Sequence, residues 1–276
     1  MTLMVMVKLL SRLPLSWLRK IGSCLGWLGF YASPSLRRVT EQNIRRAEIC
    51  ATELEIKNFV KVNIAETGKT LAELPYIWHR TRDHVVSKII TVQGREHLEM
   101  AVAKKTGIIF ITLHLGCFEI IPKFISSYVR ITSLFRPPHK KYIANLTAEG
   151  RQGNNQFFAP ANLLGVRKLI TALKNGEAVG ILPDQVPKEG EGKWVSFFGR
   201  PAYTMTLASK LFNKTQASLI FTFSVRHEKS EGYSLFFEPH KRNSKELTTL
   251  DINRKLENII LRHPTQYLWS YKRFKG

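Results

Sequence analysis

The stretch from Gly107 to Glu119 joins a strand-like run to a helix-like run across a single histidine. The run after Gly107, Ile-Ile-Phe-Ile-Thr-Leu, is apolar apart from one threonine and rich in β-branched residues, as is typical of a strand covered on both faces. His114 follows, and from Ile120 onward the apolar residues recur at helical spacing. Open α/β sheets hold their chemistry where the carboxyl end of a strand meets the start of a helix. This junction therefore predicts a buried sheet with a functional site at its edge.

His114 and Glu119 are the residues of this junction that can carry acid–base chemistry. They are five positions apart, so their side chains can meet if the chain turns between them. A carboxylate beside a histidine fixes the imidazole tautomer and stabilises its protonated form, as a general base requires. On spacing alone, a structural histidine is the alternative interpretation. Cys117, inside the same motif, is expected to pack as a small apolar residue rather than to act as a nucleophile.

The alternation of strand-like and helix-like segments continues along the chain. Glycine-bounded or β-rich runs predict strands near 85–92, 107–113, 131–135, 156–158, 178–182, 217–225 and 233–238. Helical spacing predicts helices over 52–79, 94–105, 117–128, 138–150, 162–175, 203–214 and 246–262. This pattern is that of an α/β layer fold, and no internal repeat or low-complexity linker divides it.

The first 32 residues are mostly apolar, and their only charged side chains are the cations Lys8, Arg12, Arg19 and Lys20. A charge at the centre of a membrane-spanning helix costs roughly 2.5–3.5 kcal/mol. A tilted or in-plane helix, with its aromatic residues near the headgroups, avoids that cost. We expect this segment to associate with a membrane, and its sequence leaves spanning and interfacial placement open. The predicted organisation is an N-terminal membrane anchor at residues 1–35 and one α/β catalytic domain at residues 36–276.

The charge balance of the chain is strongly positive. Lysine and arginine total 42 against 21 acidic residues, which gives a formal net charge of +21. Such an excess predicts attraction to an anionic partner: nucleic acid, an acidic protein or a phosphate-rich membrane surface. The chain has no helix-turn-helix, zinc-finger or RNP signature, so we expect no nucleic-acid partner. The three cysteines have no CxxC spacing, which indicates neither a disulfide framework nor a cysteine zinc site.

Several motifs, taken in order along the chain, resemble those of one enzyme family. His114-Leu-Gly-Cys-Phe-Glu119 is similar to the H-x4-D/E motif of glycerolipid and lipid A acyltransferases. Downstream come Phe135-Arg136-Pro137-Pro138, Arg151, Gly176-Glu-Ala-Val-Gly-Ile-Leu-Pro-Asp184-Gln185, Phe197-Phe198-Gly199 and the ending Gln266-Tyr-Leu-Trp-Ser-Tyr-Lys-Arg-Phe-Lys275. Together they resemble the late (secondary) acyltransferases of lipid A biosynthesis, the lauroyl/myristoyl transferase family within the lysophospholipid acyltransferase superfamily. The resemblance covers essentially the whole chain.

The resemblance implies a fold, a location and a reaction. The fold is a glycerolipid-acyltransferase-like mixed sheet of about seven strands flanked by helices, with an N-terminal membrane-associated helical segment. The implied location is the cytoplasmic face of the cell inner membrane. The implied reaction moves a fatty acyl chain from acyl carrier protein to a hydroxyl of a hydroxyacyl chain on a lipid A precursor. The implied partners are acyl carrier protein, that precursor and an anionic membrane surface. Another lysolipid acceptor (a glycerophospholipid, an aminolipid or a glycosylated phosphoinositide) is the alternative.

The same resemblance assigns roles to residues. His114 matches the family's catalytic base and Glu119 its partner carboxylate, while Arg151 and Asp184 match two further functional positions. The negative charge that forms on the acyl oxygen can be met by backbone N–H groups near Gly116 or by the Arg151 guanidinium, whose planar fork also suits a phosphate. Asp184 is expected to orient Arg151 or a loop backbone, with a second catalytic acid as the alternative.

Substrate binding gives further expectations. Arg136 is a candidate for contacts to acceptor phosphates. Because a thioester is already activated, we expect no metal, no cofactor beyond the acyl carrier protein co-substrate and no covalent acyl-enzyme. An apolar tunnel must hold the acyl chain, with candidate wall residues Phe118, Phe124, Phe157, Phe158, Phe197 and Phe198. Candidate docking cations are Lys140, Lys141, Arg167, Lys168, Lys272, Arg273 and Lys275.

Overall fold

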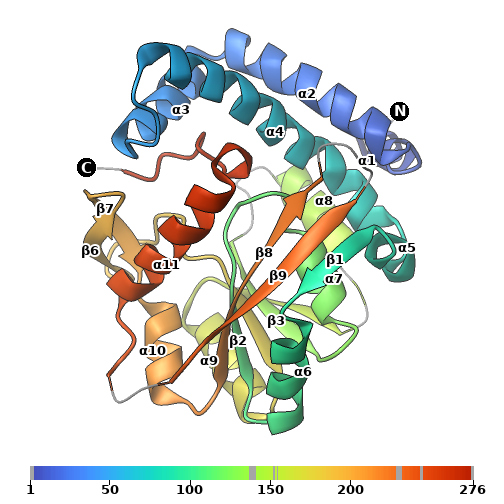
Figure 1. Ribbon diagram of the computed structural model, residues 1–276. Helices are drawn as coiled ribbons and strands as arrows, with labels where there is room; N and C mark the ends of the chain where they lie inside the picture. Colours follow the sequence, from blue (N-terminus) through green and yellow to red (C-terminus); the bar gives the residue numbers. More distant parts are fainter. Residues whose placement is uncertain are drawn as a thin grey trace.

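The computed structural model describes residues 3–136, 141–151, 153, 155–227, 232–242 and 245–274. Its centre is a seven-stranded sheet of order β1-β9-β8-β2-β5-β3-β4 (Figure 1). The strands are β1 (Ile89–Gln93), β2 (Ile108–Ile111), β3 (Ile131–Phe135), β4 (Gln156–Pro160), β5 (Ala178–Ile181), β8 (Ser218–Arg226) and β9 (Tyr233–His240). Neighbouring strands are parallel except for the antiparallel pair β8 and β9. The mixed sheet of about seven strands is therefore confirmed.

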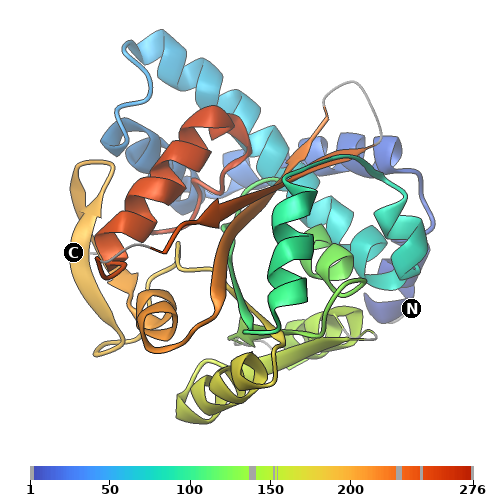
Figure 2. The ribbon, with the colours of Figure 1, turned by 60° about the horizontal axis from the view of Figure 1, so that its bottom comes forward.

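Helices cover both faces of this sheet. Alternate residues of each central strand point to opposite sides, and because both sets are apolar, both faces must be covered. Ile109 and Ile111 of β2 pack in one apolar core, and Ile108 and Phe110 pack in the other. The first core contains α9 (Leu163–Lys174), α10 (Leu207–Lys214) and α11 (Thr249–Arg262). The second contains α5 (Arg82–Val86), α6 (Arg95–Lys104) and α7 (Ile120–Ile125). Figure 2 shows the sheet between these two layers, with α11 in red on one side and α6 in green on the other.

The N-terminal helices lie against the domain rather than apart from it. They are α1 (Leu3–Leu10), α2 (Leu15–Ala32), α3 (Pro34–Arg46) and the long α4 (Glu53–His79), and α2 runs along α4 (Figure 1). Gly26 and Gly68 allow this close approach, since a Cβ on Gly68 would collide with the carbonyl oxygen of Gly22 and one on Gly26 with that of Ile64. Among the described residues, no helix is both long and apolar enough to cross a bilayer.

Five segments differ from the sequence-based expectations, the first being the strand expected near 85–92, whose first residues belong to α5 while β1 begins at Ile89. A separate hairpin of β6 (Gly192–Phe197) and β7 (Arg200–Met205) was not predicted, and its pairing displaces the start of the helix expected over 203–214 to Leu207. The helix expected over 117–128 is limited to α7. The helix expected over 138–150 corresponds to α8 (Lys141–Arg151), and residues 137–140 lie outside the described chain. Helix α3 also escaped prediction, although Ser33 caps it and Pro34 is its first residue, a recognisable start pattern.

Candidate active site

His114 lies just past the carboxyl end of β2, in a segment that the C-terminal part of the chain holds in place. Leu268 N donates to the carbonyl oxygen of His114 at 2.9 Å, and Gly116 N donates to that of Gln266 at 3.0 Å. Gly116 has φ +58°, and a Cβ there would collide with the carbonyl oxygen of Ser224. Only glycine fits such a position, so the chain turns sharply between strand and helix. The chain thus turns between His114 and Glu119, which is the condition that a contact between them would require.

Asp184 is the carboxylate that contacts His114. Its Oδ1 lies 2.9 Å from His114 Nδ1, and its Oδ2 accepts a 2.9 Å hydrogen bond from the His114 backbone N–H. The contact arises because β2 and β5 are parallel neighbours, with Ile111 beside Ile181, so that their carboxyl ends meet. On the other side of the ring, Gln185 Nε2 lies 3.3 Å from His114 Nε2. This arrangement suits an imidazole with its proton on Nδ1 and its lone pair on Nε2.

The environment keeps Asp184 ionised. Burial alone would raise the pKa of this carboxyl, which is 2% exposed, but the charge and hydrogen bonds of His114 and the charge of Arg273 lower the pKa below its usual value. Because folding lowers the pKa of Asp184, the ionised carboxylate stabilises the folded protein. This contribution to stability is fully present above the usual aspartate pKa of about 4 and is lost as pH falls through the lowered pKa. Asp184 therefore remains a carboxylate partner of His114 at neutral pH.

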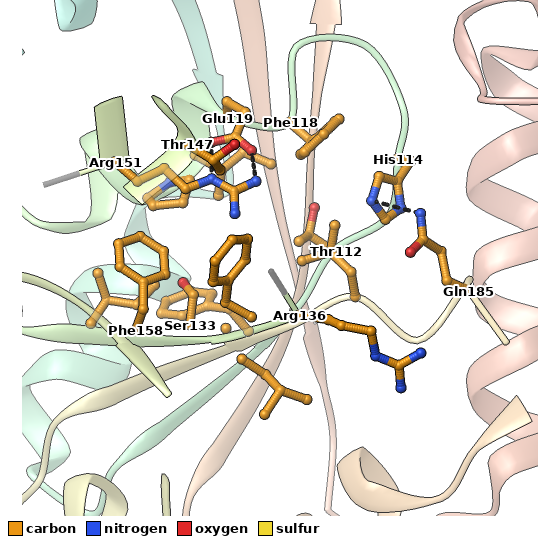
Figure 3. Close-up of a pocket in the computed structure, with 18 of the residues that line it drawn as sticks. Thr112, His114, Phe118, Glu119, Ser133, Arg136, Thr147, Arg151, Phe158 and Gln185 are labelled. Carbon is orange, nitrogen blue, oxygen red and sulfur yellow. Dashed lines mark hydrogen bonds and ion pairs between the residues drawn. The ribbon is translucent and has the colours of Figure 1, made fainter. Parts of the chain in front are cut away.

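The prediction that Glu119 holds the imidazole is wrong for this structure. Glu119 is 7% exposed, and its carboxylate accepts from Arg151 through Nε at 3.0 Å and through Nη2. It also accepts a 3.1 Å hydrogen bond from Trp78 Nε1. The dashed lines of Figure 3 join Glu119 to Arg151 and not to His114. The turn at Gly116 carries Glu119 to the start of α7, where the planar fork of Arg151 satisfies both carboxylate oxygens.

The structure also places the other predicted site residues, Asp184, Gly116 and Arg136. The prediction that Asp184 orients Arg151 is wrong, because Glu119 does so, whereas its contact with a loop backbone, that of His114, is confirmed. The N–H of Gly116 is occupied by Gln266, so it does not point to a substrate oxygen in this structure. Arg136 lies at the end of β3 with its side chain 47% exposed and 3.9 Å from Glu191.

A cavity of about 380 Å³ connects these groups (Figure 3). This volume lies in the range of small-molecule sites, roughly 300–1,000 Å³. The cavity floor is one face of the sheet, with residues from β2, β3, β4, β5 and β8, and its walls come from α4, α7 and α8. His114, Glu119, Arg136 and Arg151 all line it. The lining is mainly apolar elsewhere, for example at Phe110, Ile121, Ile125, Ile131 and Phe158. An apolar chain can therefore lie beside an acid–base pair.

Several finer predictions can now be compared with the structure. Among the candidate wall residues, Phe118 and Phe158 line the cavity, whereas Phe124, Phe157, Phe197 and Phe198 do not. Cys117 packs in the apolar core as expected, and burial raises the pKa of its thiol. The prediction that Arg273 is a docking cation is wrong, because this residue is 2% exposed and donates to the carbonyl oxygen of Tyr203. The docking candidates Lys140 and Lys275 and the motif residues Pro137 and Pro138 lie outside the described residues. For Lys141 the structure describes the backbone but not the side chain.

A buried ionic network contacts the chain at Gly116, two residues after His114. Arg226 of β8 is 4% exposed and donates to Glu73 Oε2 and Glu66 Oε2, each at 2.8 Å. Its Nη2 also donates to the carbonyl oxygen of Gly116 at 2.9 Å. Arg19 of α2 completes the network through Glu73 Oε1 at 2.7 Å. Sequence reasoning missed this network, since its charged members come from three elements, α2, α4 and β8, that are far apart in the sequence.

Comparison with known protein families identifies the family of this chain. The family model of the bacterial lipid A biosynthesis acyltransferases matches residues 2–276. The chain belongs to that family. The resemblance first noted from the His114 motif and the C-terminal ending is thus confirmed over nearly the whole sequence, and acyl transfer in lipid A biosynthesis is the activity that the family supports.

Curated relatives point to the same chemistry. The chain is 25% identical over 255 residues to the lipid A biosynthesis palmitoleoyltransferase of Escherichia coli K12, which covers 90% of this chain and 82% of that protein. It is 26% identical over 275 residues to the lauroyltransferase of the same organism, covering 97% and 88%. A lipid A biosynthesis acyltransferase of Haemophilus influenzae Rd is 24% identical over 272 residues, covering 95% and 86%. The acyltransferase thus resembles relatives named for different acyl chains.

Proposed function

We propose that this acyltransferase moves a fatty acyl chain from acyl carrier protein to a hydroxyl of a hydroxyacyl chain on a lipid A precursor. The observation that carries the proposal is the His114–Asp184 pair at one end of an apolar cavity. An alcohol is a poor nucleophile while it keeps its proton, and a positioned histidine can accept that proton. The family membership supports the lipid A acceptor, and the net charge of +21 supports an acidic carrier protein as donor.

The reaction needs one base and one activated donor. His114 Nε2 takes the proton of the acceptor hydroxyl as its oxygen forms a bond to the thioester carbon, and Asp184 stabilises the resulting imidazolium. The carbonyl electron pair moves to oxygen and then returns as the carbon–sulfur bond breaks. The leaving thiolate receives the proton from His114, which restores the neutral base. The thioester is already activated, so the proposal includes no metal and no acyl-enzyme.

We also propose a location at the cytoplasmic face of the inner membrane, and the N-terminal helices support the membrane contact that this location requires. Large apolar side chains are exposed on α1 and α2, namely Val5, Met6, Leu9, Trp17, Leu25, Leu28 and Tyr31. The exposed charged residues of the same helices, Lys8 and Lys20, are both positive, whereas Arg19 is buried in the ionic network with Glu73. Exposed apolar groups with neighbouring cations suit the interface of an anionic bilayer.

Mass spectrometry of lipid A tests the proposed acceptor. We expect lipid A from cells overexpressing the protein to gain an acyl chain that is missing from cells lacking it. Identical lipid A in both strains would contradict the proposal and would favour another lysolipid as acceptor. With purified protein, transfer from acyl carrier protein thioesters in preference to acyl-coenzyme A would support the donor assignment, and the reverse preference would contradict it.

Gly180 is expected to control acyl chain length. It is buried in β5 between Phe110 and Ser133, and it lines the cavity floor. A Cβ on Gly180 would lie 3.0 Å from Ser133 Oγ and 3.6 Å from Ile131 Cδ1, so a larger side chain fills cavity space. We expect Gly180→Val to shift kcat/KM toward shorter acyl donors by about 10-fold or more, the size of effect that a methylene or two has in an apolar pocket. Equal losses for donors of all lengths would contradict this prediction.

A further inference from the structure

Two buried threonine hydroxyls lie on the cavity floor near His114. Ile111 of β2 pairs with Phe221 of β8, so Thr112 and Thr222 are the next residues on these neighbouring parallel strands. The two threonines are 6% and 0% exposed, and both line the cavity. Neither hydroxyl has a hydrogen-bond partner among the residues that the structure describes. Figure 3 shows Thr112 between His114 and the Glu119–Arg151 pair.

Unpartnered hydroxyls in such a place call for a ligand. Buried polar groups in native proteins are nearly always hydrogen-bonded, and leaving one unpaired destabilises the fold. Valine has almost the same shape as threonine and suits a strand equally well. A chain selected for stability alone therefore gains nothing from threonine at Thr112 and Thr222. Both hydroxyls can instead donate to an acceptor atom of a molecule bound in the cavity.

Several other polar groups around the cavity already have hydrogen-bond partners. The N–H of Gly116 donates to Gln266, and Trp78 Nε1 donates to Glu119. Arg151 uses Nε and Nη2 on Glu119, and its Nη1 has no hydrogen-bond partner within the described chain. Thr112 is two residues from His114 on the same segment, so its hydroxyl is close to the position where the base acts. Within the described part of the chain, the Thr112 and Thr222 hydroxyls are the buried side-chain donors that line the cavity and have no hydrogen-bond partner.

We propose that Thr112 and Thr222 donate hydrogen bonds to the carbonyl oxygen of the acyl donor and stabilise the oxyanion that forms on it. The inference rests on the proposed acyl transfer and adds its second half, the site for negative charge. As the acceptor oxygen bonds to the carbonyl carbon, the displaced electron pair moves to the oxygen held by the two hydroxyls. When the carbonyl re-forms, the thiolate leaves and the hydrogen bonds weaken. Donors aimed at charge that develops only in the transition state raise kcat rather than substrate binding.

Substitution by valine tests this assignment with little change of shape. We expect Thr112→Val to lower kcat by about 10²–10³-fold, the usual effect of removing one oxyanion donor, with KM changed little. Thr222→Val is expected to lower kcat in the same way. Thermal denaturation should give a melting temperature equal to or above that of the parent, because an unpaired buried hydroxyl has been removed. Thr112→Ser keeps the hydroxyl and should recover most of kcat.

Ser224 provides a matched control on the same strand. Its hydroxyl is also buried and unpartnered among the described residues, but Ser224 does not line the cavity, so Ser224→Ala should leave kcat unchanged. The carbonyl is the same whichever alcohol accepts the chain, so all variants are compared with the acceptor that the parent protein uses. Failure of the parent to acylate a lipid A precursor would sink the proposed function alone. A parent-like kcat in Thr112→Val, or a change confined to KM, would overturn the oxyanion assignment.

Discussion

The variants His114→Ala and Asp184→Asn are both expected to lower kcat of acyl transfer by about 10²–10⁴-fold. The first removes the base. The second acts through the tautomer, because Oδ2 of Asp184 accepts from the His114 backbone N–H and must be replaced by the amide oxygen. The amide nitrogen then faces His114 Nδ1, which favours a proton on Nε2 and removes the lone pair that accepts the substrate proton. Steady-state transfer of a labelled acyl chain measures the effect.

Glu119→Gln is the matched comparison for Asp184→Asn. Both changes replace a buried carboxylate by an amide of the same size, but only Asp184 contacts His114. We expect Glu119→Gln to loosen Arg151 and act mainly on KM, while the pH profile of kcat stays that of the parent. Loss of kcat in Glu119→Gln together with normal turnover in Asp184→Asn would restore Glu119 as the partner of the base and refute the His114–Asp184 assignment.

The largest expected loss of stability comes from Arg226. Its guanidinium compensates the buried carboxylates of Glu66 and Glu73, and these acids in turn raise the pKa of Arg226 against the effect of burial. Arg226→Met removes this positive charge, so the buried carboxylates of Glu66 and Glu73 lose the cation that lies between them. We expect the free energy of unfolding to fall by about 3–5 kcal/mol, as for other buried pairs broken on one side. Urea denaturation measures this difference.

An exposed ion pair serves as the control for Arg226. Arg200 and Glu48 are 2.8 Å apart, with side chains 53% and 74% exposed. Water screens such a pair, so Arg200→Met should change the free energy of unfolding by no more than about 1 kcal/mol. Similar small losses in Arg226→Met and Arg200→Met would show that the buried network does not stabilise the fold in the way described.

Much of the sheet could be predicted from short sequence patterns. The apolar run at Ile108–Ile111 and the run at Ala178–Ile181 are buried strands as expected, because residues covered on both faces must be apolar throughout. The β6–β7 hairpin could not be found this way. Its strands carry exposed residues such as Lys193 and Trp194 and form a small separate sheet, so they lack the apolar pattern of a buried strand.

The local sequence also determined where the base would lie. A histidine after a buried strand and before a glycine places an imidazole at the sheet edge, because the apolar run ends there and Gly116 permits the positive φ of the turn. The partner of His114 was decided by the tertiary structure. Asp184 is 70 residues away and reaches the imidazole only because β5 pairs with β2. The carboxylate of Glu119 instead forms an ion pair with Arg151 of α8. Periodicity along a chain encodes strands, helices and turns, but contacts between distant side chains depend on which strands pair and which helices pack over them.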